Sequence, residues 1–520
     1  MKRSEIISGR GKSGVTGWIC RLRCLRRSNA GGGHILDYNN RPNVLILMSD
    51  QHRADWMTCA GNNTVPTPMI DRVAARGVRF ENAYCPYPVC TASRMSLLTG
   101  LYAHNTGAIN NSDRLDWRYR TVAHHFADHG YLTSLIGKMH FNDAHNHGFA
   151  SYLSINDWLM YLGPKVGHYA NEIANHAISE GFFNSVFDTG SGFPDVSLLW
   201  DGASPWAGNV ARWDFSSTAS PLDAEDHLDM FVARESVKFM REYRDQPFFL
   251  VASFMKPHPP FYPPREWAEQ FSPESVDLVE VGDSSQYPRH IQQRIDRTQG
   301  MGEKRLRAHK AGYMGNLSFV DYCIGRVLDG LEELGLVEDT IVVYTSDHGE
   351  MGGEHGLYQK FCMFEPAVKV PLIVSCPSRF PEGRVASALT EYFGLYPTLS
   401  ELCGLSAPDR TTLMDFEGAC ETMDAESFAS VVRDPNTQGP DAAFSEHGLR
   451  SHMPQYMVRG ERFKYVYNDG GSRHELYDLE NDPGECINLI DNRDFAGICA
   501  DLQERLFAWY DPDSNPYCER

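Results

Sequence analysis

The stretch Asn43-Val44-Leu45-Ile46-Leu47-Met48-Ser49 leads without interruption into Asp50-Gln51-His52, so a run of apolar residues ends directly in polar ones. A continuous apolar run of this length is typical of a strand buried on both faces, as in a parallel sheet. Ligands bind at the carboxyl edge of such sheets, so the polar residues indicate a site. No apolar run in the chain approaches the roughly 20 residues of a membrane-spanning helix, and the sequence predicts no membrane span.

The order of strand, loop and helix repeats along the chain. Further strands are predicted at residues 78–84, 131–136, 248–254 and 340–345, and helices at residues 66–75, 121–129, 227–243 and 304–334. Two of these strands again lead into polar residues, one into Gly137-Lys138-Met139-His140 and the other into Ser346-Asp347-His348-Gly349. The alternation predicts an α/β fold in which helices sandwich a large, mostly parallel sheet.

The character of the sequence changes after residue 405. An irregular stretch rich in Asp, Thr and Gly is followed by predicted antiparallel strands at residues 457–467 and 475–479 and by a helix near residues 495–509. We therefore expect three parts: a basic, disordered tail (1–40), an α/β domain (41–405), and a smaller C-terminal α+β subdomain (406–520) that contains a short antiparallel sheet.

The composition is that of an ordinary globular protein. The 520 residues are 42% hydrophobic and 22% charged, and a chain of this length can bury a large core. The formal net charge of −20 repels nucleic acids and acidic membrane surfaces, so neither is expected as a partner. A homo-oligomer is left open, with the segment after Trp509 as a candidate contact.

The first forty residues have the opposite charge balance, with eight Lys and Arg side chains against two acidic ones. They are interpreted as a disordered tail or an over-extended start, with a targeting or anionic-surface role as the alternative. They lack the apolar centre of a secretory signal, and thirteen cysteines are too sparse for a disulfide scaffold. We therefore expect reduced thiols and a cytoplasmic location, or a periplasmic one if the true start differs.

Residues 155–225 form the least regular segment and carry four of the nine tryptophans. Such a long aromatic insertion either packs as a lid or lines a pocket for sugar rings or quaternary amines. In both interpretations, we expect it to determine which leaving group is accepted.

One stretch places a cysteine where an anion is stabilised: Pro88-Val89-Cys90-Thr91-Ala92-Ser93-Arg94-Met95-Ser96-Leu97-Leu98-Thr99-Gly100. Cys90 comes directly before a predicted short helix, whose free backbone N–H groups and dipole favour negative charge, and Arg94 follows one turn later. The alternative interpretation of Cys90 alone is a buried structural thiol.

This stretch resembles the signature of the sulfatases, in which the cysteine of Cys-x-Pro/Ala-Ser-Arg is converted to formylglycine. The resemblance extends from residue 41 to about residue 490 and follows the family order of segments. The matching segments are Ser49-Asp50-Gln51-His52-Arg53-Ala54-Asp55, Thr67-Pro68-Met69-Ile70-Asp71, Gly137-Lys138-Met139-His140-Phe141, Pro257-His258-Pro259, Ser346-Asp347-His348-Gly349 with Lys360, and Leu476-Tyr477-Asp478-Leu479 within the closing region 464–488. The fold expected from this resemblance is that of the alkaline-phosphatase-like superfamily.

The Asp-Gln and Asp-His pairs resemble the choline-sulfatase and phosphonate monoester hydrolase branch most. Two positions depart from the family pattern. Ala92 stands where most aerobically matured sulfatases have proline, which leaves open the maturase that installs the formylglycine. The segment Leu413-Met414-Asp415-Phe416-Glu417-Gly418 lacks a clean version of the usual family turn.

The resemblance implies a metal site and a set of catalytic residues. Asp50, Gln51, Asp347 and His348, with the modified Cys90, are implied to bind a divalent metal. Calcium suits the oxygen ligands, and manganese is the alternative because of the imidazole. Capping of helices or turns is the other interpretation of the two aspartates.

The remaining implied roles concern the sulfate and its protons. His140 is the implied base that deprotonates the second hydroxyl at position 90, so that sulfate is expelled from the other oxygen, and His258 is implied to protonate or stabilise the leaving alkoxide. Lys138, Lys360 and Asn111 hold the sulfate oxygens, and Arg94 orients the formylglycine.

The predicted activity is hydrolysis of a sulfate monoester of a small molecule or a saccharide. A phosphonate monoester or phosphodiester hydrolase is the nearest alternative, since a tetrahedral anion site with lysines serves both reactions. If Cys90 stays unmodified, the alternative is a non-catalytic protein that binds sulfate or metal.

Overall fold

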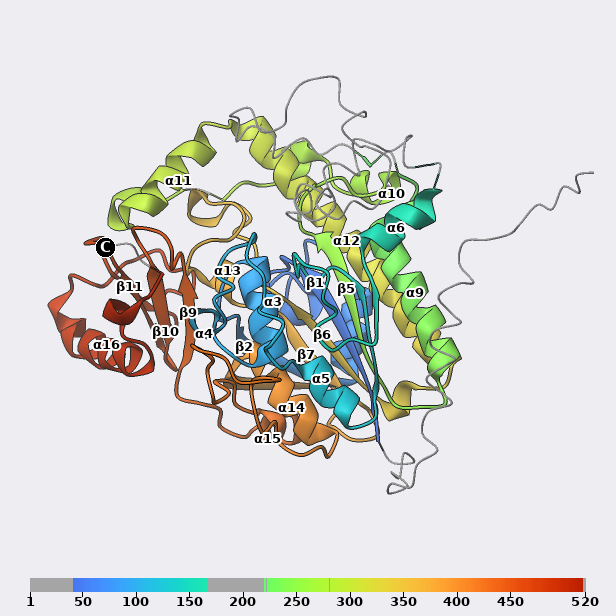
Figure 1. The fold of residues 1–520 in the computed structure, drawn as a ribbon. Helices are drawn as coiled ribbons and strands as arrows, with labels where there is room; N and C mark the ends of the chain where they lie inside the picture. The colour runs from blue at the N-terminus through green and yellow to red at the C-terminus, as the bar shows by residue number, and fades with distance from the viewer. Residues whose placement is uncertain (1–40, 164, 166–218, 221, 280, 518–520) are drawn as a thin grey trace, which may run out of the picture. The chain divides into compact units, whose positions relative to one another are not determined.

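The computed structural model describes residues 41–163, 165, 219–220, 222–279 and 281–517 (Figure 1). The predictions for residues 1–40, and most of the aromatic insertion at 155–225, lie outside the described residues. Residues 41–520 cluster as one unit, and the predicted division at residue 405 stays a prediction. In the described part of the chain, every helix is too short or too polar to span a bilayer.

A sheet of eight strands forms the centre of the unit, in the order β4-β3-β5-β1-β6-β7-β2-β8. Neighbouring strands are parallel except where β7 meets β6 and β2. The strands are β1 (Asn43–Asp50), β2 (Gly77–Tyr84), β3 (Leu132–Gly137), β4 (Ser151–Leu153), β5 (Phe248–Pro257), β6 (Thr340–Ser346), β7 (Leu372–Ser375) and β8 (Arg384–Glu391). The predicted α/β fold with a mostly parallel sheet is therefore confirmed.

Strand β1 shows why both faces of the sheet are covered. Its side chains alternate between two cores, with Val44 and Ile46 in one and Leu45 and Leu47 in the other. Helices on one side of the sheet are α3 (Cys90–Thr99), α5 (Val122–Asp128), α14 (Leu395–Leu402) and α15 (Ala429–Arg433). Helices on the other side are α2 (Pro68–Ala75), α6 (Ile155–Leu162), α9 (Leu228–Tyr243) and α12 (Glu303–Glu333). Figure 1 shows α3, α5 and α14 in front of the sheet. Trp158, predicted in the irregular insertion, belongs to α6 and is fully buried in the second core.

The C-terminal region adds the predicted antiparallel sheet, in the order β12-β11-β10-β9 (Figure 1). Its strands are β9 (Ala443–His447), β10 (Gln455–Arg459), β11 (Phe463–Asn468) and β12 (Glu475–Asp478), and α16 (Ala496–Trp509) packs against it. The remaining α-helices are α4 (Ala103–Thr106), α10 (Arg265–Ala268), α11 (Arg289–Gln299) and α13 (Glu365–Val368).

Candidate active site

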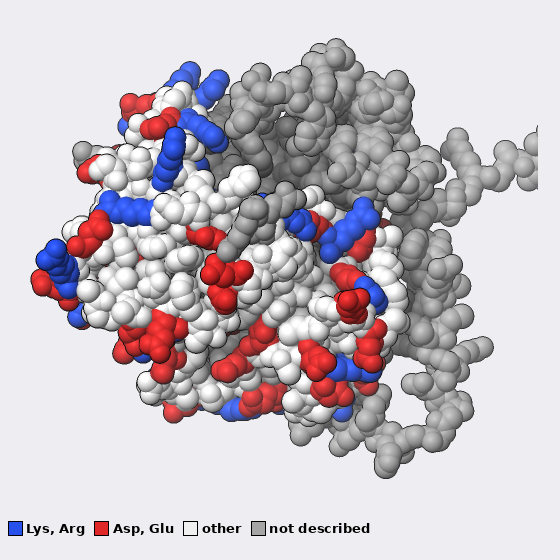
Figure 2. Space-filling model, turned by 60° about the vertical axis from the view of Figure 1, so that its left-hand side comes forward, with Lys and Arg blue, Asp and Glu red and all other residues white. Residues whose placement is uncertain are grey.

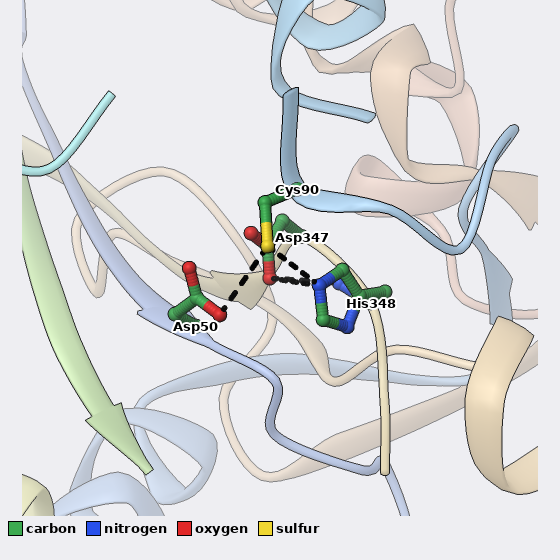
Figure 3. Close-up of side chains that lie close together, drawn as sticks. All are labelled: Asp50, Cys90, Asp347 and His348. Carbon is green, nitrogen blue, oxygen red and sulfur yellow. Dashed lines mark hydrogen bonds and ion pairs between the residues drawn. The ribbon is translucent and has the colours of Figure 1, made fainter. Parts of the chain in front are cut away.

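The ends of two neighbouring strands bring the predicted acidic ligands together. β1 and β6 pair in parallel with Ser49 opposite Ser346, so Asp50 and Asp347 leave the sheet side by side at its carboxyl edge. Cys90, the first residue of α3, points into the same space as His348 (Figure 3). One ligand atom from each of Asp50, Cys90, Asp347 and His348 lies within 4.8 Å of the others, and all four residues are buried.

The cysteine lies inside this cluster rather than beside it. Its Sγ is 3.2 Å from His348 Nε2 and 3.9 Å from Asp50 Oδ1. Burial and Asp50 favour the neutral thiol, but Lys360, Lys138 and His348 outweigh them, and the pKa of Cys90 is lowered. The charges of these three side chains therefore favour an anion at position 90.

Arg94 connects the two aspartates. It lies one helical turn after Cys90, and its guanidinium donates to Asp347 Oδ2 at 2.7 Å and to Asp50 Oδ2 at 3.0 Å. The same group donates to the carbonyl of Lys138 at 2.7 Å and to Ser253 Oγ at 2.9 Å. Four of the five N–H groups of Arg94 thus hold the carboxylates and neighbouring strand ends in place, and its role toward the residue at position 90 stays a prediction.

Two buried lysines approach the cluster from different elements. Lys138, directly after β3, has its Nζ 2.8 Å from Asp50 Oδ2. Lys360 donates to Gln51 Oε1 at 2.5 Å and lies 3.6 Å from Cys90 Sγ. Acidic and basic side chains are interspersed over the face shown in Figure 2, whereas these lysines are only 2% exposed. The positive charge available to an anion is therefore inside the site.

The two predicted catalytic histidines are buried and differ in their contacts. Neither ring nitrogen of His140 has a hydrogen-bond partner among the described residues, and burial together with Lys138 and Arg94 keeps its pKa well below the ordinary value. His258 donates from Nδ1 to the carbonyl of Pro259 at 2.7 Å, which leaves Nε2, 4.0 Å from Asp50 Oδ1, as the proton-accepting nitrogen. Both imidazoles are therefore held in the neutral, basic form.

Asn111 is outside α3 in the sequence, but its side chain contacts the first turn of that helix. Its side-chain oxygen accepts a hydrogen bond from the backbone of Thr91 at 3.2 Å, next to Cys90. Its backbone carbonyl is held by Asn142 Nδ2 at 2.7 Å. The structure thus brings all eleven predicted site residues to one edge of the sheet; their individual roles stay predictions.

Several site residues have a left-handed backbone conformation, which residues other than glycine rarely adopt. Gln51 and His140 have φ values of 67° and 66°, and Gln359 and Phe361, on either side of Lys360, have values of 66° and 73°. Left-handed backbone is uncommon outside glycine and concentrates where surrounding contacts fix a functional geometry. Its recurrence at three separate segments of the site indicates that surrounding contacts fix the backbone there.

The donor set fits a hard divalent cation. Asp50 Oδ2 accepts from Arg94 and Lys138, but the nearest polar side-chain atoms described for Asp50 Oδ1 are Cys90 Sγ at 3.9 Å and His258 Nε2 at 4.0 Å. A buried carboxylate oxygen without a close donor among the described residues is suited to a cation. Gln51 adds an amide oxygen beside it, and His348 an imidazole nitrogen.

Three further residues form hydrogen bonds to the predicted site residues or their neighbours but belong to none of the predicted motifs. Glu350 contacts Gln51, and Asn316 donates from Nδ2 to the carbonyls of Pro257, His258 and Pro260 at 3.1–3.4 Å. Arg294 donates to the carbonyl of Lys360 at 2.6 Å. The sequence offers a signal for Asn316, a polar residue within the apolar face of a long helix, and for Glu350, a charge directly after the strand-end motif.

The fold and the site define an α/β protein with buried lysines and a group of side chains that could hold a metal ion at the carboxyl edge of its sheet, around a helix-start cysteine. The family model for sulfatases matches residues 42–405, and the chain belongs to the sulfatase family. A second model, the C-terminal region of N-sulphoglucosamine sulphohydrolase, matches residues 353–511. The chain is therefore an enzyme of this family, whose members generally use a metal.

Three similar proteins span most of the chain. An arylsulfatase of Clostridium perfringens is 29% identical over 466 residues, 88% of this chain and 91% of that protein. A choline-sulfatase of Rhizobium meliloti is 26% identical over 467 residues, 87% of this chain and 83% of that protein. The crystal structure of a phosphonate monoester hydrolase of Agrobacterium radiobacter has a TM-score of 0.71 at 25% identity and covers 90% of this chain and 95% of that one. The predicted resemblance, including its branch, is confirmed.

Proposed function

We propose that this protein hydrolyses a sulfate monoester with a nucleophile made from Cys90. The observation that carries the proposal is the position of Cys90 Sγ, at the start of a buried helix and within 4 Å of His348, Asp50 and Lys360. Conversion of Cys90 to formylglycine supplies a hydrated aldehyde whose hydroxyl attacks sulfur. The contacts of Cys90 Sγ support the proposal, because the oxygens of the modified residue would take the place of that sulfur.

The metal that fits this site is Ca²⁺, with Mn²⁺ as the alternative, held by Asp50, Gln51, Asp347, His348 and the modified residue 90. When bound, such a cation favours the ionised hydroxyl at position 90 and offsets charge on the sulfate oxygens. Arg94 keeps the two carboxylates in place through its hydrogen bonds of 2.7 and 3.0 Å.

The residues around the cluster divide the remaining work. Lys138, Lys360 and Asn111 bind sulfate oxygens, where fixed positive charge and donors stabilise the developing negative charge. His140, neutral and without a partner among the described residues, removes the proton from the second hydroxyl so that sulfate leaves. His258 takes up a proton before it gives one to the leaving alkoxide, and the negative charge of the bound ester favours that uptake.

Two measurements test the proposal. Mass spectrometry of the peptide that contains Cys90, from natively produced protein, should show replacement of the thiol by an aldehyde; a thiol alone favours a non-catalytic binding protein. Turnover of an aryl sulfate should exceed that of the matched aryl phosphonate monoester. Higher efficiency on the phosphonate would assign the chain the chemistry named for its structural neighbour in Agrobacterium radiobacter.

A further inference from the structure

The buried carboxylate of Glu350 contacts a predicted metal ligand and accepts hydrogen bonds at both of its oxygens. Glu350 follows Asp347 by three residues and is fully buried. One oxygen accepts backbone hydrogen bonds from Gly352 at 3.0 Å and Gln359 at 2.6 Å, and the other accepts from Gln51 Nε2 at 2.5 Å. Burial opposes the ionisation of Glu350, but His309 and the two backbone donors keep its pKa below the ordinary value.

The amide of Gln51 lies between this carboxylate and an ammonium group. Its nitrogen donates to Glu350, and its oxygen accepts from Lys360 Nζ at 2.5 Å. The opposite orientation would place the amide NH₂ against the ammonium and the amide oxygen against the carboxylate. Both contacts would then be repulsive, so the two neighbours together permit one orientation.

We propose that Glu350 is a positioning residue that holds the amide oxygen of Gln51 toward the metal site, an inference that rests on the proposed function. An amide contributes to the coordination of a hard cation only through its oxygen. Hydrogen bonds from a second layer of residues fix the orientation of metal ligands in this way. Glu350 touches neither the reacting atoms nor the cluster of Asp50, Cys90, Asp347 and His348.

The same carboxylate also fixes the segment that carries Lys360. It holds the backbone N–H of Gln359, the residue directly before Lys360, in a stretch whose φ values are 66° and 73° on either side of the lysine. Glu350 thereby holds both the Gln51 amide and the backbone next to Lys360, and so helps to set the distance between these two side chains. Loss of the carboxylate should affect the metal ligand and the sulfate-binding lysine together.

An exchange of the two side chains tests the proposal. In E350Q, the amide oxygen stays on the backbone donors of Gly352 and Gln359, so its NH₂ group faces the NH₂ group of Gln51 and turns that amide around. In Q51E, two buried carboxylates face each other, and their repulsion moves the carboxylate at position 51 away from its place at the metal site. In the double variant Q51E/E350Q, the amide introduced at position 350 donates to the carboxylate introduced at position 51, and an oxygen again faces the metal. E354Q, an amide substitution in the same segment at a residue that is 33% exposed and paired with the buried Arg53, is the matched control.

The readout is affinity for Ca²⁺ and Mn²⁺, obtained from the rise of the melting temperature with metal concentration and independent of any turnover. We expect each single variant to lose about 10- to 100-fold in metal affinity. The double variant should regain most of it, and E354Q should bind as the wild type does. Circular dichroism confirms folding, and if E350Q does not fold, Q51E and the double variant still make the comparison.

The proposal is overturned if E350Q binds metal as tightly as the wild type, or if the losses of Q51E and E350Q add in the double variant. A merely structural role for Glu350 predicts that addition. Failure of the wild type itself to bind either metal would instead contradict the metal site of the proposed function, so the two failures are distinguishable.

Discussion

Two buried lysines, Lys464 in the C-terminal sheet and Lys360 beside Cys90, show two uses of a buried positive charge. Lys464 is fully buried between two carboxylates, Glu365 at 3.2 Å and Glu485 in closer contact. Lys360 is 2% exposed and has no ion pair with a carboxylate anywhere in the described parts of the chain. Its ammonium contacts an amide oxygen and the thiol instead.

The presence or absence of a carboxylate partner distinguishes a buried charge that stabilises the fold from one that is available to a ligand. Burial of an ion is costly unless a partner of opposite charge offsets it, and Glu365 and Glu485 provide that partner for Lys464. The burial of Lys360 has no such offset, and under the proposed function the anionic substrate would provide it. A buried charge without a partner of opposite charge, in a structure where a comparable buried charge is paired, is typical of a functional site.

Loss of Lys464 should have the largest effect. In Lys464→Met, two carboxylates remain buried without their cation, and we expect a loss of about 3–5 kcal/mol in the free energy of unfolding. Urea denaturation followed by fluorescence measures it. The activity of the variant that remains folded should be unchanged, because Lys464 does not contact the site.

The matched control is Lys369→Met. Lys369 lies 3.8 Å from the same Glu365, but its side chain is 28% exposed. A partly solvated pair of this kind is expected to contribute below about 1 kcal/mol. Equal losses in the two variants would show that burial does not distinguish them.

The second prediction concerns Lys360, whose loss should lower activity and leave stability unchanged or higher. Lys360→Met should lower kcat/KM for an aryl sulfate about 10²- to 10³-fold, as expected for removal of one fixed positive group from an anion site. The free energy of unfolding should stay the same or rise, because an ammonium without a carboxylate partner is removed. If Lys360→Met is as unstable as Lys464→Met, the lysine is structural and the comparison fails.

The sequence predicted the strands that position the site because these strands are continuous apolar runs. Strands β1, β3, β5 and β6 were found within a few residues of their observed bounds, and two of the polar segments that follow them meet at Asp50 and Asp347. The family resemblance added His258, Asn111 and Lys360, which have no strand-end signal of their own.

Other elements could not be predicted from local pattern. Strand β7 has four residues, and β8, at the sheet edge, mixes exposed and buried residues, so neither forms a long apolar run. Glu350 and Lys464 matter only through partners that are distant in sequence: Gln51 lies 299 residues from Glu350. Such pairs are set by the fold, and a single sequence does not contain them.

The third prediction concerns acid stability near Lys464. His355 is 7% exposed, and burial together with Lys464 and Arg53 lowers its pKa to about 4. The folded state therefore keeps this imidazole neutral, while the unfolded chain binds a proton below about pH 6.5. Its contribution to stability is fully present above that pH, and about 3 kcal/mol is lost as the pH falls toward 4.

Denaturation of the wild type and of His355→Asn at several pH values between 7 and 4 checks this prediction. Asparagine tolerates the backbone at this position, where φ is 53°. The variant should be less stable at pH 7, because the hydrogen bond to Tyr287 at 2.8 Å is lost, but its stability should fall less steeply with acid. Parallel curves for the two proteins would contradict the prediction.

The smallest expected effect lies on the segment that carries His258. Asn316→Leu removes three weak hydrogen bonds to the carbonyls of Pro257, His258 and Pro260, and the imidazole then loses part of its fixed position. Because His258 is proposed to act on the leaving alkoxide, kcat for sulfate esters with poor leaving groups should fall about tenfold, or about 1.4 kcal/mol. Esters with good leaving groups need no proton and should be hydrolysed at nearly the wild-type rate. Ser318→Ala, on the exposed side of the same helix, should change neither rate. Equal losses for both kinds of ester would mean that Asn316 supports folding alone.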